Sequence, residues 1–149
     1  MKTIISEERF VDIMIKRAEI YDSVIRDIEI DRKEVERFKT YISGRINTAT
    51  AFAEAVERDI KQYGFDGDKE FLINSWSDVI LMDKVALKLL EKATPGSIFA
   101  FQEIYEDANK IIQGVMYALD KREEEKENKR LKRLRIVWED NHNGEACPF

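Results

Sequence analysis

The sequence has few of the residues that build covalent or metal-held folds and sharp turns. Its 149 residues include one cysteine, one histidine, two prolines and six glycines. A single cysteine, Cys147, excludes an internal disulfide framework and fits a reducing cytoplasm. His142 and Cys147 alone cannot build a structural zinc site, and no glycine-rich phosphate loop occurs. The sequence therefore predicts no metal site and no cofactor, and it does not point to a chemical reaction.

Long hydrophobic runs are missing as well. The longest stretch without a charged residue covers residues 93–102, only ten residues that include Pro95 and Gly96. A transmembrane helix needs about 20 predominantly apolar residues. We therefore expect no interaction with a membrane and a cytoplasmic location. The formal net charge of −5 also argues against a general attraction to nucleic acid.

Apolar residues are instead spaced for helices, because one apolar position returns every seven residues along residues 14–63, about a third of the chain. This spacing keeps one stripe along a helix rather than one face of a strand. The repeat consists of Met14, Tyr21, Ile28, Val35, Ile42, Ala49, Val56 and Tyr63.

A second position of the same repeat carries a charge in every other layer. It reads Phe10, Arg17, Val24, Asp31, Phe38, Arg45, Phe52 and Asp59. A simple two-stranded zipper would bury these charges, and an unpaired buried ion costs several kcal/mol. The neighbouring heptad position is mostly apolar, so the apolar stripe is wide. The pattern therefore favours a helical bundle over a lone zipper.

The first helix is expected to begin after Ser6 and to run through Ile28. Asp31 and Glu34 have the spacing of a capping box, which predicts a new helix there, although one continuous helix through Asp31 stays an alternative. Gly44 lies among poor helix formers and marks a second place for a bend at residues 43–47. Of the two possible breaks, we favour the one at residues 29–33.

Two more helices follow the glycines at 64 and 67. The helix expected at residues 68–93, capped by Asp68, should be the most buried, because nine of the twelve residues 79–90 are apolar and only Asp83, Lys84 and Lys88 form a polar strip. The last helix begins near Ser97 and has no stop signal before Asn141. Residues 120–130 contain no apolar side chain, so this part of the helix should project from the bundle or run along a second subunit.

The best candidate for a functional surface is the segment at residues 129–138. It combines three apolar residues on one helix face with five surrounding cations, a pattern suited to a groove on a protein partner or to a phosphate backbone. A merely structural role, with the apolar residues packed on the same fold, is an equally good explanation. The candidate partner-binding residues are Lys129, Arg130, Leu131, Lys132, Arg133, Leu134, Arg135 and Trp138.

Two short motifs resemble those of helical enzymes. Arg135 and His142, separated by six residues, resemble the arginine and histidine pair of HEPN ribonucleases, although Ile136 follows the arginine where that family has a polar residue. Glu103 and Glu106 resemble an acidic motif of MazG-like nucleotide pyrophosphatases, which implies magnesium binding. In that family the second acidic motif, represented here by Asp120 and Glu123, follows a turn, whereas here it would lie on the same helix.

The sequence as a whole predicts an all-α, up-down bundle of four long helices. We expect one helical domain at residues 1–140, with its last helix projecting from about residue 120, and a flexible tail at residues 141–149. The function that fits best is that of a non-enzymatic adaptor, inhibitor or assembly scaffold, forming a homodimer through long-helix or coiled-coil contacts and binding a protein partner. The alternatives are a nucleic-acid-binding protein and a small metal-dependent or HEPN-like hydrolase.

Overall fold

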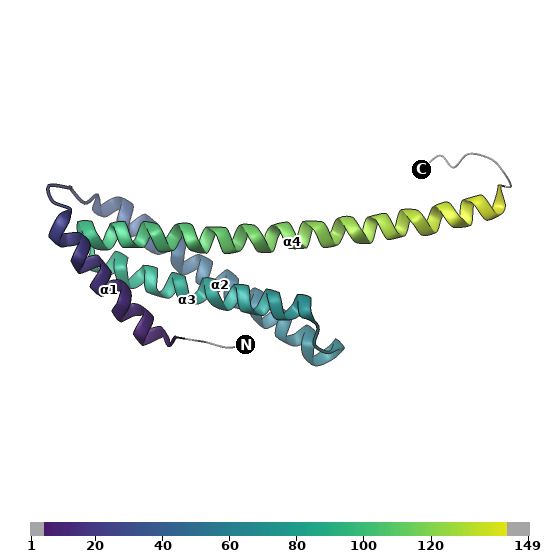
Figure 1. The fold of residues 1–149 in the computed structure, drawn as a ribbon, viewed down its shortest axis with the longest axis horizontal. Helices are drawn as coiled ribbons and strands as arrows, with labels where there is room; N and C mark the ends of the chain where they lie inside the picture. Colours follow the sequence, from purple (N-terminus) through teal and green to yellow (C-terminus); the bar gives the residue numbers. More distant parts are fainter. Residues whose placement is uncertain (1–4, 143–149) are drawn as a thin grey trace. The chain divides into compact units, whose positions relative to one another are not determined.

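The computed structural model describes residues 5–142, and this part of the chain is an all-α bundle without strands. The four helices are α1 (Glu7–Val24), α2 (Arg32–Tyr63), α3 (Gly67–Lys92) and α4 (Pro95–Asn141) (Figure 1). The predicted fold class is confirmed. None of these helices pairs the length with the apolar character that a bilayer-spanning segment requires.

The chain divides into two compact units, and the boundary lies within α4. The first unit covers residues 1–112 and the second covers residues 113–149. Most of the predicted tail, residues 143–149 with Cys147, lies outside the described residues. The single domain and the projecting end of α4 stay predictions.

The connection between α1 and α2 shows whether a new helix starts at Asp31 or one helix continues through it. α1 starts at Ser6, whose side chain accepts a hydrogen bond from the Arg9 amide at 3.2 Å, but it ends at Val24. The expected extension through Ile28 is wrong. Asp27 adopts a left-handed conformation with φ of 61°, which aspartate tolerates better than most residues.

α2 begins where the capping pattern predicts. The Asp31 carboxylate accepts hydrogen bonds from the amides of Lys33 and Glu34 at 3.0 and 3.3 Å. One continuous helix through Asp31 is therefore wrong. The helix then continues without a break through Gly44 to Tyr63, so residues 43–47 do not end it.

α2 and α3 form an antiparallel hairpin around a three-residue turn. Gly64 ends α2 with φ of 90°, a conformation that glycine adopts without strain. Asp66, rather than the expected Asp68, caps α3 by accepting a hydrogen bond from the Lys69 amide at 2.8 Å. Further along the hairpin the rings of Phe52 and Trp76 lie 5.0 Å apart.

α4 begins two residues earlier than expected, with a reciprocal cap. The Thr94 amide donates to Ser97 Oγ at 2.9 Å, and the Ser97 amide donates to Thr94 Oγ1 at 3.1 Å. Pro95 occupies the first helical position, where its missing N–H costs nothing. These bonds satisfy amides that a helix start otherwise leaves unpaired.

The seven-residue repeat supplies the buried face of α2 and part of the buried face of α1. All three buried residues of α2, Val35, Ile42 and Ala49, belong to it, as does Met14 of α1. The repeat fails at Tyr63, which is 72% exposed at the end of α2. α3 contributes eight buried residues against two from α1 and three from α2, which confirms its predicted deep burial.

Candidate docking surfaces

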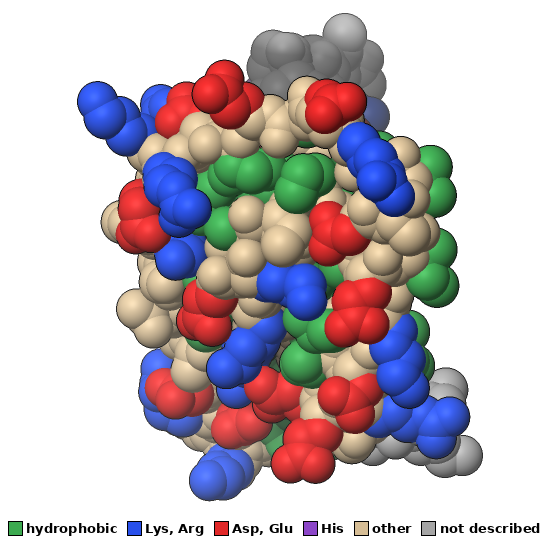
Figure 2. Space-filling model, turned by 90° about the vertical axis from the view of Figure 1, so that its left-hand side faces the viewer, with side chains coloured by type: hydrophobic (Ala, Val, Ile, Leu, Met, Phe, Trp, Pro, Cys, Tyr) green, Lys and Arg blue, Asp and Glu red, His purple; other side chains and the backbone are tan. Residues whose placement is uncertain are grey.

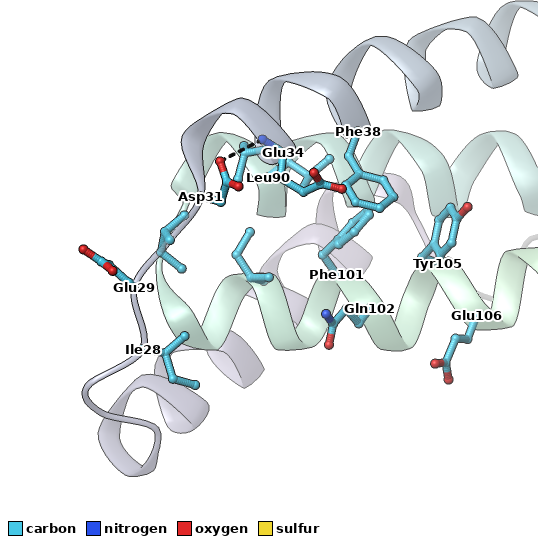
Figure 3. A pocket seen from close by; sticks show the side chains of 13 residues that line it. Ile28, Glu29, Asp31, Glu34, Phe38, Leu90, Phe101, Gln102, Tyr105 and Glu106 are labelled. Carbon is cyan, nitrogen blue, oxygen red and sulfur yellow. Dashed lines mark hydrogen bonds between the residues drawn. The ribbon is translucent and has the colours of Figure 1, made fainter.

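A groove of about 550 Å³ lies in the first unit, beside the α1–α2 loop and between α2 and the start of α4 (Figure 3). Its base contains Val35, Leu90 and Phe101, which are all buried. Its sides carry apolar residues that are partly or fully exposed, and Ile28 in the loop is 55% exposed. These side residues are Ile28, Ile30, Phe38, Ile98 and Tyr105. The groove can therefore accept an apolar side chain from another molecule.

Acidic residues surround this apolar surface. Glu29, Asp31, Glu34 and Glu106 contribute to the lining, which includes no lysine or arginine. Two of them have other roles, since Asp31 caps α2 and Glu34 pairs with Arg37. On the side of the molecule that carries the α1–α2 loop, hydrophobic side chains are exposed among both acidic and basic side chains (Figure 2). The groove thus favours an apolar ligand that carries positive charge.

Aromatic rings from α2 and α4 form one wall of the groove. The Phe38 ring lies 5.3 Å from Phe101 and 5.7 Å from Tyr105, in edge-to-face geometry. Tyr105 also meets Tyr41 at 6.3 Å, and the Arg45 guanidinium lies 5.0 Å from the centre of the Tyr105 ring. Such contacts add about 0.5–1.5 kcal/mol per aromatic pair beyond simple burial, so they fix the shape of this wall.

Arg45 holds three helices together through a buried polar cluster. Its Nε and one terminal nitrogen donate to the two carboxylate oxygens of Asp83 at 2.8 and 2.7 Å, and its other terminal nitrogen donates to Asn109 Oδ1 at 2.6 Å. Burial alone would lower the pKa of Arg45, but the hydrogen bonds and the attraction to Asp83 raise it above its ordinary value. The guanidinium therefore stays charged inside the bundle.

This cluster corrects the expected polar strip on α3. Lys84 and Lys88 are exposed, but the Asp83 side chain is 0% exposed. Asp83 follows Val79 by four residues and precedes Ala86 by three, so it shares their buried face. It was predicted to lie beside the two lysines because these three are the only charged residues among residues 79–90.

α1 is fixed to the start of α4 by Asp22. Its carboxylate accepts a hydrogen bond from Thr94 Oγ1 at 2.7 Å and another from the Gly96 amide at 2.6 Å. A Cβ atom at Gly96 would lie 2.2 Å from the Ala18 carbonyl oxygen, so only glycine permits this approach. No sequence motif predicted this role of Asp22.

The MazG-like resemblance rests on Glu103 and Glu106, and the structure places the Glu103 carboxylate among other partners. Tyr21 donates its hydroxyl to Glu103 at 2.5 Å, and Arg17 approaches to 3.5 Å. The hydrogen bond to Glu103 raises the pKa of Tyr21. Within residues 5–142 no three histidine, cysteine or acidic side chains lie close enough together to hold a metal ion.

The predicted partner-binding segment, residues 129–138, lies entirely on α4 in the second unit. Leu134 is 42% exposed and Val137 is 58% exposed, and together with Lys126, Arg130 and Arg133 they surround a shallow hollow. Leu131 and Trp138 are only half-buried. Val137 was not among the predicted residues of this surface, although it follows Leu134 by three residues on the helix.

Some charges of the segment are paired along the helix. Arg130 donates to Glu127 at 2.5 and 3.2 Å, and this bonding lowers the pKa of Glu127.

At the end of α4 the His142 ring stacks on Trp138 with centroids 4.0 Å apart, and His142 Nδ1 lies 2.7 Å from the Trp138 carbonyl oxygen. The histidine of the HEPN-like pair is thus in contact with Trp138.

Comparisons with protein-family models, with curated proteins and with solved structures find no match to this chain.

Proposed function

We propose that this protein is a non-enzymatic interaction protein that works in the cytoplasm as an adaptor, inhibitor or assembly scaffold. It acts through helix surfaces, self-associates as a dimer and binds a protein partner. The observation that carries this proposal is the surface of residues 129–138. Leu134, Ile136 and Val137 expose large apolar side chains there, among five cations in the seven residues 129–135.

Apolar anchors ringed by charge are the usual anatomy of a protein-binding surface. The apolar side chains supply affinity by leaving water, and the charges supply orientation and speed of association. Holding three large apolar side chains in water on a solvated helix costs free energy that a partner would recover. The proposal explains why apolar residues return on α4 after the wholly polar residues 120–130.

The experiment is a measurement of mass in solution, by sedimentation or light scattering, over a range of concentrations. The full chain should reach twice its mass of 17.5 kDa. Val137→Glu should return it to the monomer, because the new charge would be placed against the apolar surface of the partner. Val24→Glu is the matched control, since Val24 is also an exposed helical valine, on α1. A chain that stays monomeric at all concentrations would contradict the self-association.

The protein partner is tested with the same variants. A partner recovered from cell extract with the full chain should be lost with Val137→Glu and kept with Val24→Glu. A partner that both variants bind equally well would show that another surface is used.

Nucleic acid is a second candidate ligand for the same segment, because residues 129–135 contain five basic side chains and no acidic one. The acidic residues at 123–125 and 127 precede them, and Arg130 already pairs with Glu127, so this candidate has less support. If it were correct, affinity for DNA or RNA would fall steeply with added salt and with charge reversal at Arg133.

A further inference from the structure

The groove of the first unit and the segment at residues 129–138 are complementary in charge. The groove lining holds four carboxylates and no basic side chain, a formal charge of −4. The segment holds five cations and no acid, a formal charge of +5. Opposite charges around apolar surfaces steer two molecules together and exclude wrong partners.

The two surfaces also match in length and in residue spacing. The wall that α4 gives the groove presents Ile98, Gln102 and Tyr105, at intervals of four and then three residues. The segment presents Leu131, Leu134 and Trp138, at intervals of three and then four. These intervals coincide when the segment runs antiparallel to the wall, so that Trp138 lies beside Ile98 and Leu131 beside Tyr105.

In this alignment the next residue on each side also forms a favourable pair. Arg130, which precedes Leu131, comes beside Glu106, which follows Tyr105 on the groove lining. A helix rises about 1.5 Å per residue, so the wall at residues 98–106 and the segment both span roughly 12–14 Å. The fit is of the kind by which an amphipathic helix binds in an apolar groove.

From this complementarity we propose that the groove of one molecule binds residues 129–138 of a second copy of the same chain. The proposal rests on the proposed function, and it names the surface that receives the segment. Each copy carries both the acidic groove and the basic helix. Two molecules related by a twofold axis can therefore each bind residues 129–138 of the other in their groove. This closed arrangement forms the same contact twice and thereby doubles the buried area.

Charge reversal of the full chain tests the alignment. Glu106→Lys and Arg130→Glu should each raise the dissociation constant of the dimer about tenfold, because each replaces an attraction by a repulsion in both contacts. The double variant Glu106→Lys/Arg130→Glu should return it to within about threefold of the original value. Glu57→Lys is the matched control, because Glu57 is also an exposed glutamate and lies on α2 outside the groove.

Cross-linking then tests the contact itself. In a chain with Cys147→Ser, the pair Gln102→Cys and Leu134→Cys should form a disulfide between two molecules under mild oxidation. The alignment places these two positions opposite each other, and a disulfide needs Cα atoms ~4.4–6.8 Å apart. The pair Glu57→Cys and Leu134→Cys should not cross-link. The absence of a disulfide in a dimeric protein would overturn the proposal.

The outcomes separate the two proposals. If the dimer is lost with Val137→Glu but unaffected by Glu106→Lys, the groove is not the receiving surface, while self-association through the segment stands. A double variant that is weaker than both single variants would also reject this alignment. A chain that is monomeric throughout rejects the groove assignment together with the self-association.

Discussion

The pair of Arg45 and Asp83 gives the sharpest prediction about stability, because both side chains are largely removed from water. The Arg45 side chain is 10% exposed and the Asp83 side chain is 0% exposed. Removing one partner of a buried ion pair leaves the other charge uncompensated, which costs about 3–5 kcal/mol. We therefore expect Asp83→Leu and Arg45→Met each to lower the free energy of unfolding by about that amount.

Removing both charges together should cost much less. Apolar residues of similar volume often replace a buried ion pair with no loss of stability, because the cost of desolvating the ions disappears with them. Asn109 would lose the hydrogen bond from Arg45, but it is only half-buried and can bind water instead. The double variant Arg45→Met/Asp83→Leu should lose no more than about 2 kcal/mol and be more stable than either single variant.

Urea denaturation followed by circular dichroism measures these differences, provided that the dependence on urea is the same in all variants. Arg45→Lys keeps the charge but loses the fork that binds both carboxylate oxygens, so its cost should lie between those of the original chain and Arg45→Met. Glu123→Gln is the surface control. It breaks an exposed pair with Lys126 and should leave the unfolding free energy almost unchanged.

Two results would refute this reasoning. One is a cost below about 1 kcal/mol for Asp83→Leu, because that value is typical of an exposed ion pair. The other is a double variant whose cost equals the sum of the single costs, because residues that do not interact give additive effects.

Three further predictions concern the backbone and one titrating group. Ala93→Gly should raise the unfolding free energy by about 0.5–1 kcal/mol in urea denaturation, because Ala93 ends α3 with a left-handed φ of 50°. Gly96→Ala should lower it by at least about 2 kcal/mol through its collision with α1, whereas Gly114→Ala, which meets no atom within 4 Å, should not lower it. Tyr21→Phe should remove a tyrosine that ionises above the ordinary pKa of about 10, as followed by tyrosinate absorbance, because the bond to Glu103 raises its pKa. Since the folded state keeps this proton to higher pH than the unfolded state, its stabilisation is complete below pH ~10 and is lost as the pH rises through the raised pKa.

The fold could be predicted from the sequence wherever local signals agree with the periodic pattern. The stripe through Val35, Ile42 and Ala49 predicted the buried face of α2, and Asp31 predicted its start. The end of α1 could not be placed in this way, because the repeat continues to Ile28 while the chain already turns at Asp27. A turn that depends on one aspartate in a left-handed conformation has a weak sequence signal.

The polar cluster could have been predicted from the sequence by comparing two helices. Arg45 on α2 and Asp83 on α3 each lie among apolar positions. Neither pattern on its own shows that the two side chains meet. In an antiparallel hairpin, residues equally far from the turn lie side by side, and the contact of Phe52 with Trp76 follows the same register. The sequence alone could thus have paired Arg45 with Asp83. The hydrogen bond from the Gly96 amide to Asp22 depends on a close approach of α1 to α4, and no sequence pattern predicts that approach.

The buried ion pair that stabilises the bundle is separate from the exposed side chains whose substitution tests the proposed dimer. Arg45 and Asp83 are buried in the first unit, whereas Glu106 and Val137 expose their side chains to water. Substitutions at the exposed pair should therefore change association and leave the unfolding of the monomer nearly unaltered. Arg45 connects the two properties, because its guanidinium lies against the Tyr105 ring in the groove wall. The apolar double variant can thus fold stably and still bind a second copy less tightly, since it leaves this ring without its cation.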